Sequence, residues 1–226
     1  EQAVDRIFLF DSHGLVTKDR EGLTPLKQKF AHEQEPQSTF LDAIGEVKPT
    51  AIVGCAAQAG SFNAYVLSAM ARINERPIIF ALSNPTSRSE CTAREAYTYT
   101  EGKCLFASGS PFPQVEVNGK TFIPRQSNNS YVFPGIGLGL VVSSPRIVPQ
   151  SVFLSAAEAL SKIVSEDDLE NGSLFPSLTK IREVSQSIAA AVAEQCFTAG
   201  VAGVPKPDDL SKAIQEAMYK PVYDRI

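Results

Sequence analysis

The sequence predicts an α/β fold in which a doubly wound parallel sheet is followed by a helical segment. Through the first half of the 226-residue chain, short apolar runs alternate with segments of helical periodicity. This alternation is typical of a parallel sheet covered by helices. From residue 151 onward only helical patterns occur. The length allows a substantial core, in one large domain or two small ones.

The predicted strands are apolar runs that stop at small or polar residues, and the predicted helices have apolar residues three or four apart. The helix over 89–100 is expected to be capped by Thr86 or Ser87, with Glu90 in its first turn. Asn118-Gly119 predicts the turn of a hairpin over 115–122. We expect strands over residues 7–10, 50–54, from 78 onward and 104–107, and helices beginning at Thr24-Pro25 and over 39–47, 63–74 and 89–100.

The second half predicts helices over residues 152–164, 166–170, 181–199 and 209–219, with Ser151 as the cap of the first. The glycines of residues 133–142 do not have GxGxxG spacing. We therefore interpret them as a close contact with another helix rather than as a phosphate-binding loop.

Composition excludes several classes of function. Hydrophobic residues make up 43% of the chain and charged residues 20%, and no apolar run approaches the roughly 18 residues of a membrane span. A net charge of -4 without a basic cluster predicts no nucleic-acid partner. The four cysteines are too widely spaced for a metal site, and we expect them to be reduced in an intracellular protein. Cytoplasm, mitochondrial matrix and plastid are not distinguished.

Asp11 directly follows the first predicted strand. Dinucleotide-binding folds use an acidic residue at the end of a strand to hold the adenosine ribose hydroxyls, although Asp also begins turns for purely local reasons. In such folds a strand, a GxGxxG turn and a helix come before the acidic residue, and the sequence shows none of them before Asp11. We therefore expect an incomplete Rossmann-like sheet whose first β-α unit is missing.

Two further strand ends are candidate ligand sites. Residues 55–61 are mostly small, which lets a ligand approach the backbone at the start of the next helix, although tight helix packing explains the same composition. Ser83 and Asn84 follow the apolar run from residue 78, at the sheet edge where ligands bind in α/β folds. A plain Asn-Pro turn is the alternative. Gly54 to Gly60 lacks the Lys-Ser/Thr ending of a P-loop, so we reject an ATPase.

Several sequence blocks, in one order, resemble the carboxyl-terminal portion of malic enzymes. They are FDSHGL at 10–15, FAHE at 30–33, VKPTAIVG at 47–54, NERPIIFALSNPT at 74–86, FASGSPF at 106–112, NNSYVFPGIGLGL at 128–140 and IREVS at 181–185. The resemblance implies an oxidoreductase that decarboxylates L-malate to pyruvate and CO2 with a nicotinamide cofactor and Mg2+ or Mn2+. It also implies a homo-oligomer, dimer or tetramer.

The resemblance also implies an organisation and a set of site residues. Residues 1–128 would be the remainder of the dinucleotide-binding domain, 129–200 a helical segment returning to the malate-binding domain, and 201–226 a tail used in assembly. Ser12 and Lys27 match positions that meet the 2′-phosphate, which favours NADP over NAD. The implied cofactor residues are Asp11, Ser12, Lys27, Val53, Gly54, Cys55, Ala56, Ala57, Leu82, Ser83 and Asn84, and the implied malate residues are Asn84 and Asn129.

By the same resemblance, the general acid, the general base and the metal ligands lie upstream of Glu1. We expect no catalytic residue and no metal ligand in this chain, and no malate oxidation by the chain alone. Two alternatives remain at this point. One is a non-catalytic Rossmann-like module for binding or assembly, and the other is a dehydrogenase acting on a different hydroxy acid.

Overall fold

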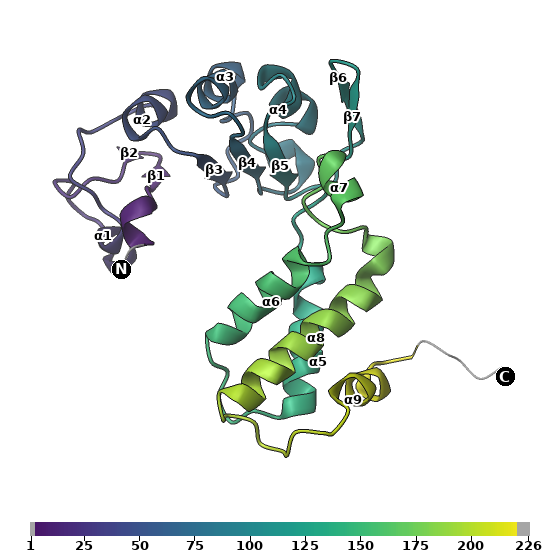
Figure 1. The fold of residues 1–226 in the computed structure, drawn as a ribbon. Coiled ribbons are helices and arrows are strands. Elements are labelled where there is room, and N and C mark those ends of the chain that lie inside the picture. Colours follow the sequence, from purple (N-terminus) through teal and green to yellow (C-terminus); the bar gives the residue numbers. More distant parts are fainter. Residues whose placement is uncertain (1–2, 221–226) are drawn as a thin grey trace. The chain divides into compact units, whose positions relative to one another are not determined.

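The computed structural model describes residues 3–220, and within the chain two compact units are distinguished, Glu1–Gln126 and Ser127–Ile226. The first unit contains the strands and the second is helical (Figure 1). None of the helices among the described residues has the length and apolar character that a membrane span requires.

The first unit is built on a parallel sheet of three strands in the order β3-β4-β5. These are β3 (Ala51–Gly54), β4 (Ile78–Ala81) and β5 (Leu105–Ser108), in register from Ala51 opposite Ile78 to Ala81 opposite Ser108. Helices α3 (Ala64–Ile73) and α4 (Ala93–Tyr99) make the two crossovers. Because both crossovers step in the same direction, the right-handed rule places both helices on one face, as Figure 1 shows.

The core of the first unit lies between this face and the helices. Phe106, Ile79 and Tyr97 are fully buried there, and the Tyr97 ring stacks on Phe122 with 4.1 Å between centroids. Phe122 belongs to a hairpin of β6 (Val115–Val117) and β7 (Lys120–Phe122). Asn118 and Gly119 have φ of 52° and 75° at its turn, so the predicted hairpin is confirmed.

Helix starts in the first unit follow their caps. Thr24 caps α1 (Pro25–Lys29), Thr39 caps α2 (Phe40–Val47) and Asn63 caps α3, each by accepting a backbone N–H bond. The predicted start of the fourth helix is wrong. Thr86 begins a separate 3-10 turn, η2 (Thr86–Arg88), and α4 is capped by Thr92 in a capping box with Glu95.

The strand predicted over residues 7–10 is also wrong. A 3-10 turn, η1 (Val4–Arg6), comes first, and the two-residue strand β1 (Phe10–Asp11) pairs antiparallel with β2 (Gly14–Leu15). Gly14, with φ of 102°, lets the chain reverse directly after Asp11. The carbonyl of Leu9 therefore accepts from Val16 N–H at 2.8 Å instead of from a parallel strand.

The second unit packs α5 (Phe133–Ser143) and α6 (Ser151–Ser161) against α8 (Ile181–Thr198). Gly135 and Gly139 of α5 face α8. A Cβ added at Gly135 would lie 2.7 Å from Ile188 Cβ, and one added at Gly139 would lie 2.7 Å from Ala189 O. The predicted close helix contact is thus confirmed. The remaining elements of this unit are η3 (Asn129–Tyr131), α7 (Glu166–Glu170), η4 (Leu178–Lys180) and α9 (Leu210–Ala217).

Ser151 is not the cap of α6 as predicted. It is the first residue of the helix, and no side chain caps that end. Its hydroxyl instead accepts a bond from the Gln195 amide of α8 at 3.0 Å. A contact with a neighbouring helix has replaced the local capping bond.

Candidate functional site

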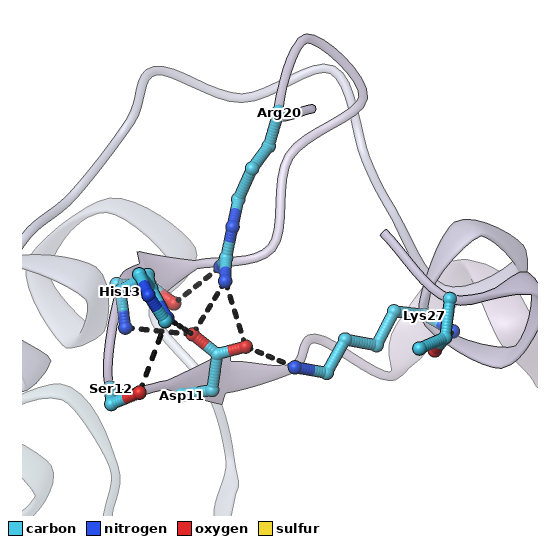
Figure 2. A network of polar contacts seen from close by, with 7 residues as sticks. Asp11, Ser12, His13, Arg20 and Lys27 are labelled. Carbon is cyan, nitrogen blue, oxygen red and sulfur yellow. Dashed lines mark hydrogen bonds and ion pairs between the residues drawn. The ribbon is translucent and has the colours of Figure 1, made fainter. Parts of the chain in front are cut away.

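The first cluster of polar side chains surrounds Asp11 at the end of β1 (Figure 2). Arg20 Nη2 donates to both carboxylate oxygens of Asp11, at 2.8 and 2.9 Å. Lys27 Nζ, from α1, forms an ion pair with the same carboxylate. The His13 backbone N–H donates at 2.8 Å. The carboxylate of the hairpin thus has two cations beside it, Arg20 from the following loop and Lys27 from the short helix α1.

These contacts decide the charge of Asp11. Burial alone would raise the pKa of the carboxyl, but the bonds from Lys27, the His13 N–H and Arg20 outweigh burial and hold its pKa well below the ordinary value. The Asp11 side chain is 21% exposed and that of Lys27 38%. The cluster is therefore a fixed ionic network with access to solvent, rather than a titrating group near neutral pH.

Ser12 lies at the open side of this network. The residue is exposed, and its hydroxyl lies 3.2 Å from His13 Nδ1. The structure brings Asp11, Ser12 and Lys27 into one cluster, as Figure 2 shows. Arg20 was missed in the sequence. It is one of many charges in residues 18–35, and no local pattern indicates that the loop returns it to Asp11.

The second cluster lies at the carboxyl ends of β3 and β4. Leu82 N–H donates to Gly54 O at 2.9 Å, which continues the strand pairing by one residue. The Ala57 N–H donates to Ser83 Oγ at 2.9 Å. The residues after β3 and those after β4 are therefore linked directly, and the predicted residues Gly54, Ala57 and Ser83 come together.

Exposure differs sharply among the residues of this second cluster. Val53 is 56% exposed, Cys55 to Ala57 are exposed, and Ser83 is 6% exposed. Asn84 is exposed at the end of the segment and precedes Pro85 through a cis peptide bond.

A residue that the sequence did not indicate completes the second cluster. Glu90 was expected in the first turn of a helix, but it lies before α4 and is 1% exposed. Its carboxylate accepts from Ser83 N–H at 3.3 Å and from the Ser83 hydroxyl. Nothing in the local sequence distinguishes it from a surface glutamate.

Asn129 belongs to the second unit and is described there by itself. It is exposed and begins η3, whose cap is Asn128, with Oδ1 accepting from Ser130 N–H at 2.8 Å. Within residues 3–220 no group of three or more His, Cys, Asp or Glu side chains is placed to hold a metal ion.

Comparison with known proteins identifies the family of the chain. Residues 1–197 match the family model described as the malic enzyme, NAD binding domain. The chain belongs to the malic enzyme family. The predicted resemblance and the predicted α/β fold are both confirmed.

Its relatives in this family use either cofactor. The chain is 48% identical over 225 residues to the chloroplastic NADP-dependent malic enzyme of Zea mays. It is 46% identical over 227 residues to the mitochondrial NAD-dependent malic enzyme of Ascaris suum. These alignments cover 99% and 100% of the chain but 35% of each relative, so the chain spans about a third of their length. The family assignment leaves the choice between NADP and NAD open.

Two solved structures share the fold. A malic enzyme of Entamoeba histolytica aligns with a TM-score of 0.69 at 23% identity, covering 94% of this chain and 43% of that one. A malic enzyme of Pyrococcus horikoshii aligns with a TM-score of 0.65 at 24% identity, covering 89% and 42%. At these identities the likeness supports the fold alone.

Proposed function

We propose that this chain is the carboxyl-terminal, cofactor-binding portion of an enzyme that oxidises L-malate to pyruvate and CO2 while reducing NADP, with NAD as the possible alternative. The observation that supports this most strongly is the Asp11 cluster. A carboxylate accepts hydrogen bonds from ribose hydroxyls, and adjacent cations suit a ribose 2′-phosphate. Asp11, Lys27 and Arg20 supply both kinds of group at one point.

We assign the adenosine end of the cofactor to this cluster. Asp11 would bind ribose hydroxyls, and Ser12 and Lys27 the 2′-phosphate of NADP. Both oxygens of Asp11 already accept bonds from cations. Binding of a phosphate would therefore draw Lys27 away from the Asp11 carboxylate, and the cost of breaking that ion pair would reduce the binding free energy gained with NADP. Val53 and Gly54, at the end of β3, and the exposed residues Cys55, Ala56 and Ala57 that follow would line the adenosine side.

We assign the nicotinamide end to the residues after β4. Leu82, Ser83 and Asn84 would lie along the nicotinamide, and the exposed Asn84 amide offers both a donor and an acceptor to malate. Asn129 is proposed as a further malate contact on the resemblance alone. When bound, the nicotinamide would accept a hydride from malate. Holding that ring beside the substrate is the contribution proposed for this chain.

The remaining chemistry is assigned to residues outside this chain. The family resemblance implies a tyrosine acid, a lysine base and carboxylate ligands for Mg2+ or Mn2+ in the part of the enzyme not represented here. We also propose a homo-oligomer, dimer or tetramer, in which residues 201–226 contribute to assembly; residues 221–226 of this tail lie outside the described residues. Light scattering on the complete enzyme tests that proposal, and a monomeric active enzyme would contradict it.

Absorbance at 340 nm tests the proposed function. The purified 226-residue chain, given L-malate, NADP and Mn2+, is expected to form no NADPH, whereas the complete enzyme that contains it forms NADPH at a rate proportional to enzyme. Pyruvate and CO2 should appear in equal amounts. Malate-dependent NADPH formation by the isolated chain would contradict the assignment of the acid, the base and the metal ligands to other residues.

A further inference from the structure

Glu90 is a buried carboxylate that the proposed chemistry does not use. It is 1% exposed, in the segment between η2 and α4. Among the described residues, two groups donate to its carboxylate, the Ser83 backbone N–H at 3.3 Å and the Ser83 hydroxyl. The ion pairs described within residues 3–220 do not include Glu90.

A carboxylate buried in this way lowers the stability of the folded chain. Burying a charged group lowers stability unless it is paired and well hydrogen-bonded, and two neutral donors offset only part of that cost. An apolar side chain of similar volume would serve packing better. The placement therefore indicates that Glu90 fixes the position of its donors.

Those donors connect two strand ends. A serine hydroxyl has one proton and two acceptor sites. Ser83 donates its proton to Glu90 and accepts the Ala57 N–H at 2.9 Å, so one hydroxyl links these two residues. Ala57 has a φ of 54°, a left-handed conformation that costs free energy for any residue with a Cβ. The bond to Ser83 helps to hold the chain in that conformation.

Gly54 makes room for this arrangement. A Cβ at Gly54 would lie 2.4 Å from both Cγ and Cδ of Glu90, so the glutamate side chain passes directly over the end of β3. Glu90 thus contacts Gly54 and Ser83, at the ends of two neighbouring strands, and acts on Ala57 through the Ser83 hydroxyl.

We propose that Glu90 is a positioning residue of the dinucleotide site. Through Ser83 it holds residues 55–57 and residues 82–83 in the relative position in which both segments contact the cofactor. This proposal rests on the proposed function, because it takes these two segments as the cofactor-binding walls. Glu90 itself does not touch the cofactor.

Steady-state kinetics of the complete enzyme tests the proposal with Glu90→Gln. Glutamine keeps the volume but has one acceptor oxygen for two Ser83 donors, so the hydroxyl loses its anionic acceptor. The KM for NADP is expected to rise about tenfold, the size of effect that loss of one charge-assisted bond produces. The KM for malate should change less than about twofold.

A double variant shows whether Glu90 acts through Ser83. Ser83→Ala should raise the KM for NADP to a similar extent, and the double variant should be no worse than the more affected single variant. Glu95→Gln is the control, because Glu95 is an exposed carboxylate on the helix that directly follows Glu90. It should leave the KM for NADP unchanged. If Glu90→Gln does not fold, Glu90→Asp, which keeps the carboxylate but shortens its reach to Ser83, replaces it in the same single and double variants.

Three results would overturn the proposal. One is a Glu90→Gln enzyme with lower thermal stability but an unchanged KM for NADP, which would make Glu90 purely structural. The second is additive effects in the double variant, and the third is a Ser83→Ala enzyme with wild-type KM. A wild-type enzyme that shows no malate-dependent reduction of either cofactor would instead overturn the proposed function, and this proposal with it.

Discussion

Lys27 forms an ion pair with Asp11 across a separation of 16 residues. The pair joins the end of β1 to the short helix α1, and Arg20 donates to the same carboxylate from the loop between them. The proposed ribose-binding acid and the proposed phosphate-binding cation are thus already in contact with each other. On the proposed function, cofactor preference would depend on how a 2′-phosphate competes with Asp11 for its cations.

The Asp11 network should stabilise the chain above mildly acidic pH. The pKa of Asp11 is lowered in the folded protein, so its contribution is present above the unfolded pKa of about 3.9 and is lost as pH falls toward the folded value. Asp11→Asn is expected to lower the free energy of unfolding by about 1 kcal/mol at pH 7.

Urea denaturation at pH 7 and at pH 3 measures this effect. The difference in the free energy of unfolding between wild type and Asp11→Asn should shrink at the lower pH. Below a pKa of about 3.9 the Asp11 carboxyl of the unfolded wild-type chain takes up a proton, which stabilises the unfolded state. Asp19→Asn, at an exposed position in the same loop, is the matched control. A difference that stays constant or grows on acidification would refute the account of Asp11.

The glycines of α5 should respond in opposite directions to alanine. At Gly139 an added Cβ would lie 2.7 Å from Ala189 O, whereas at Gly137 it would meet nothing within 4 Å. Gly139→Ala is expected to destabilise the helical unit by about 1–3 kcal/mol through overpacking. Gly137→Ala should stabilise it by about 0.5–1 kcal/mol, because alanine favours a helix over glycine.

Thermal unfolding of the two variants checks this prediction. Both substitutions add one methyl group to the same helix, so the contrast between them isolates the contact with α8. Equal shifts of Tm for both variants would show that α5 and α8 do not pack as closely as the structure indicates.

Local features were predictable from the sequence where one short segment determines them. The helices expected to begin at Thr24, Thr39 and Asn63 begin there, each of these residues capping its helix, and Asn118-Gly119 makes its turn. The start of α4 was missed, although Thr92-Ala-Arg-Glu95 has the capping-box spacing. The polar residues at Thr86 and Ser87 form an independent 3-10 turn that looks the same in sequence.

Partners distant in the chain were not predictable. Arg20 reaches Asp11 only because the chain reverses at Gly14 and the following loop folds back. Glu90 is buried only because Gly54, 36 positions earlier in the numbering, leaves space above β3. The sequence indicated which residue types the site contains, whereas the side chains that fix their positions depend on the tertiary fold.

The central claim is that Lys27 belongs to the site that discriminates NADP from NAD. Steady-state kinetics of the Lys27→Gln variant of the complete enzyme with each cofactor tests it most directly, with Lys29→Gln on the same helix as the control. We expect the KM for NADP to rise about tenfold and that for NAD less than about twofold, because only NADP carries the 2′-phosphate. Equal changes in the two KM values, or an equal effect of Lys29→Gln, would contradict the claim.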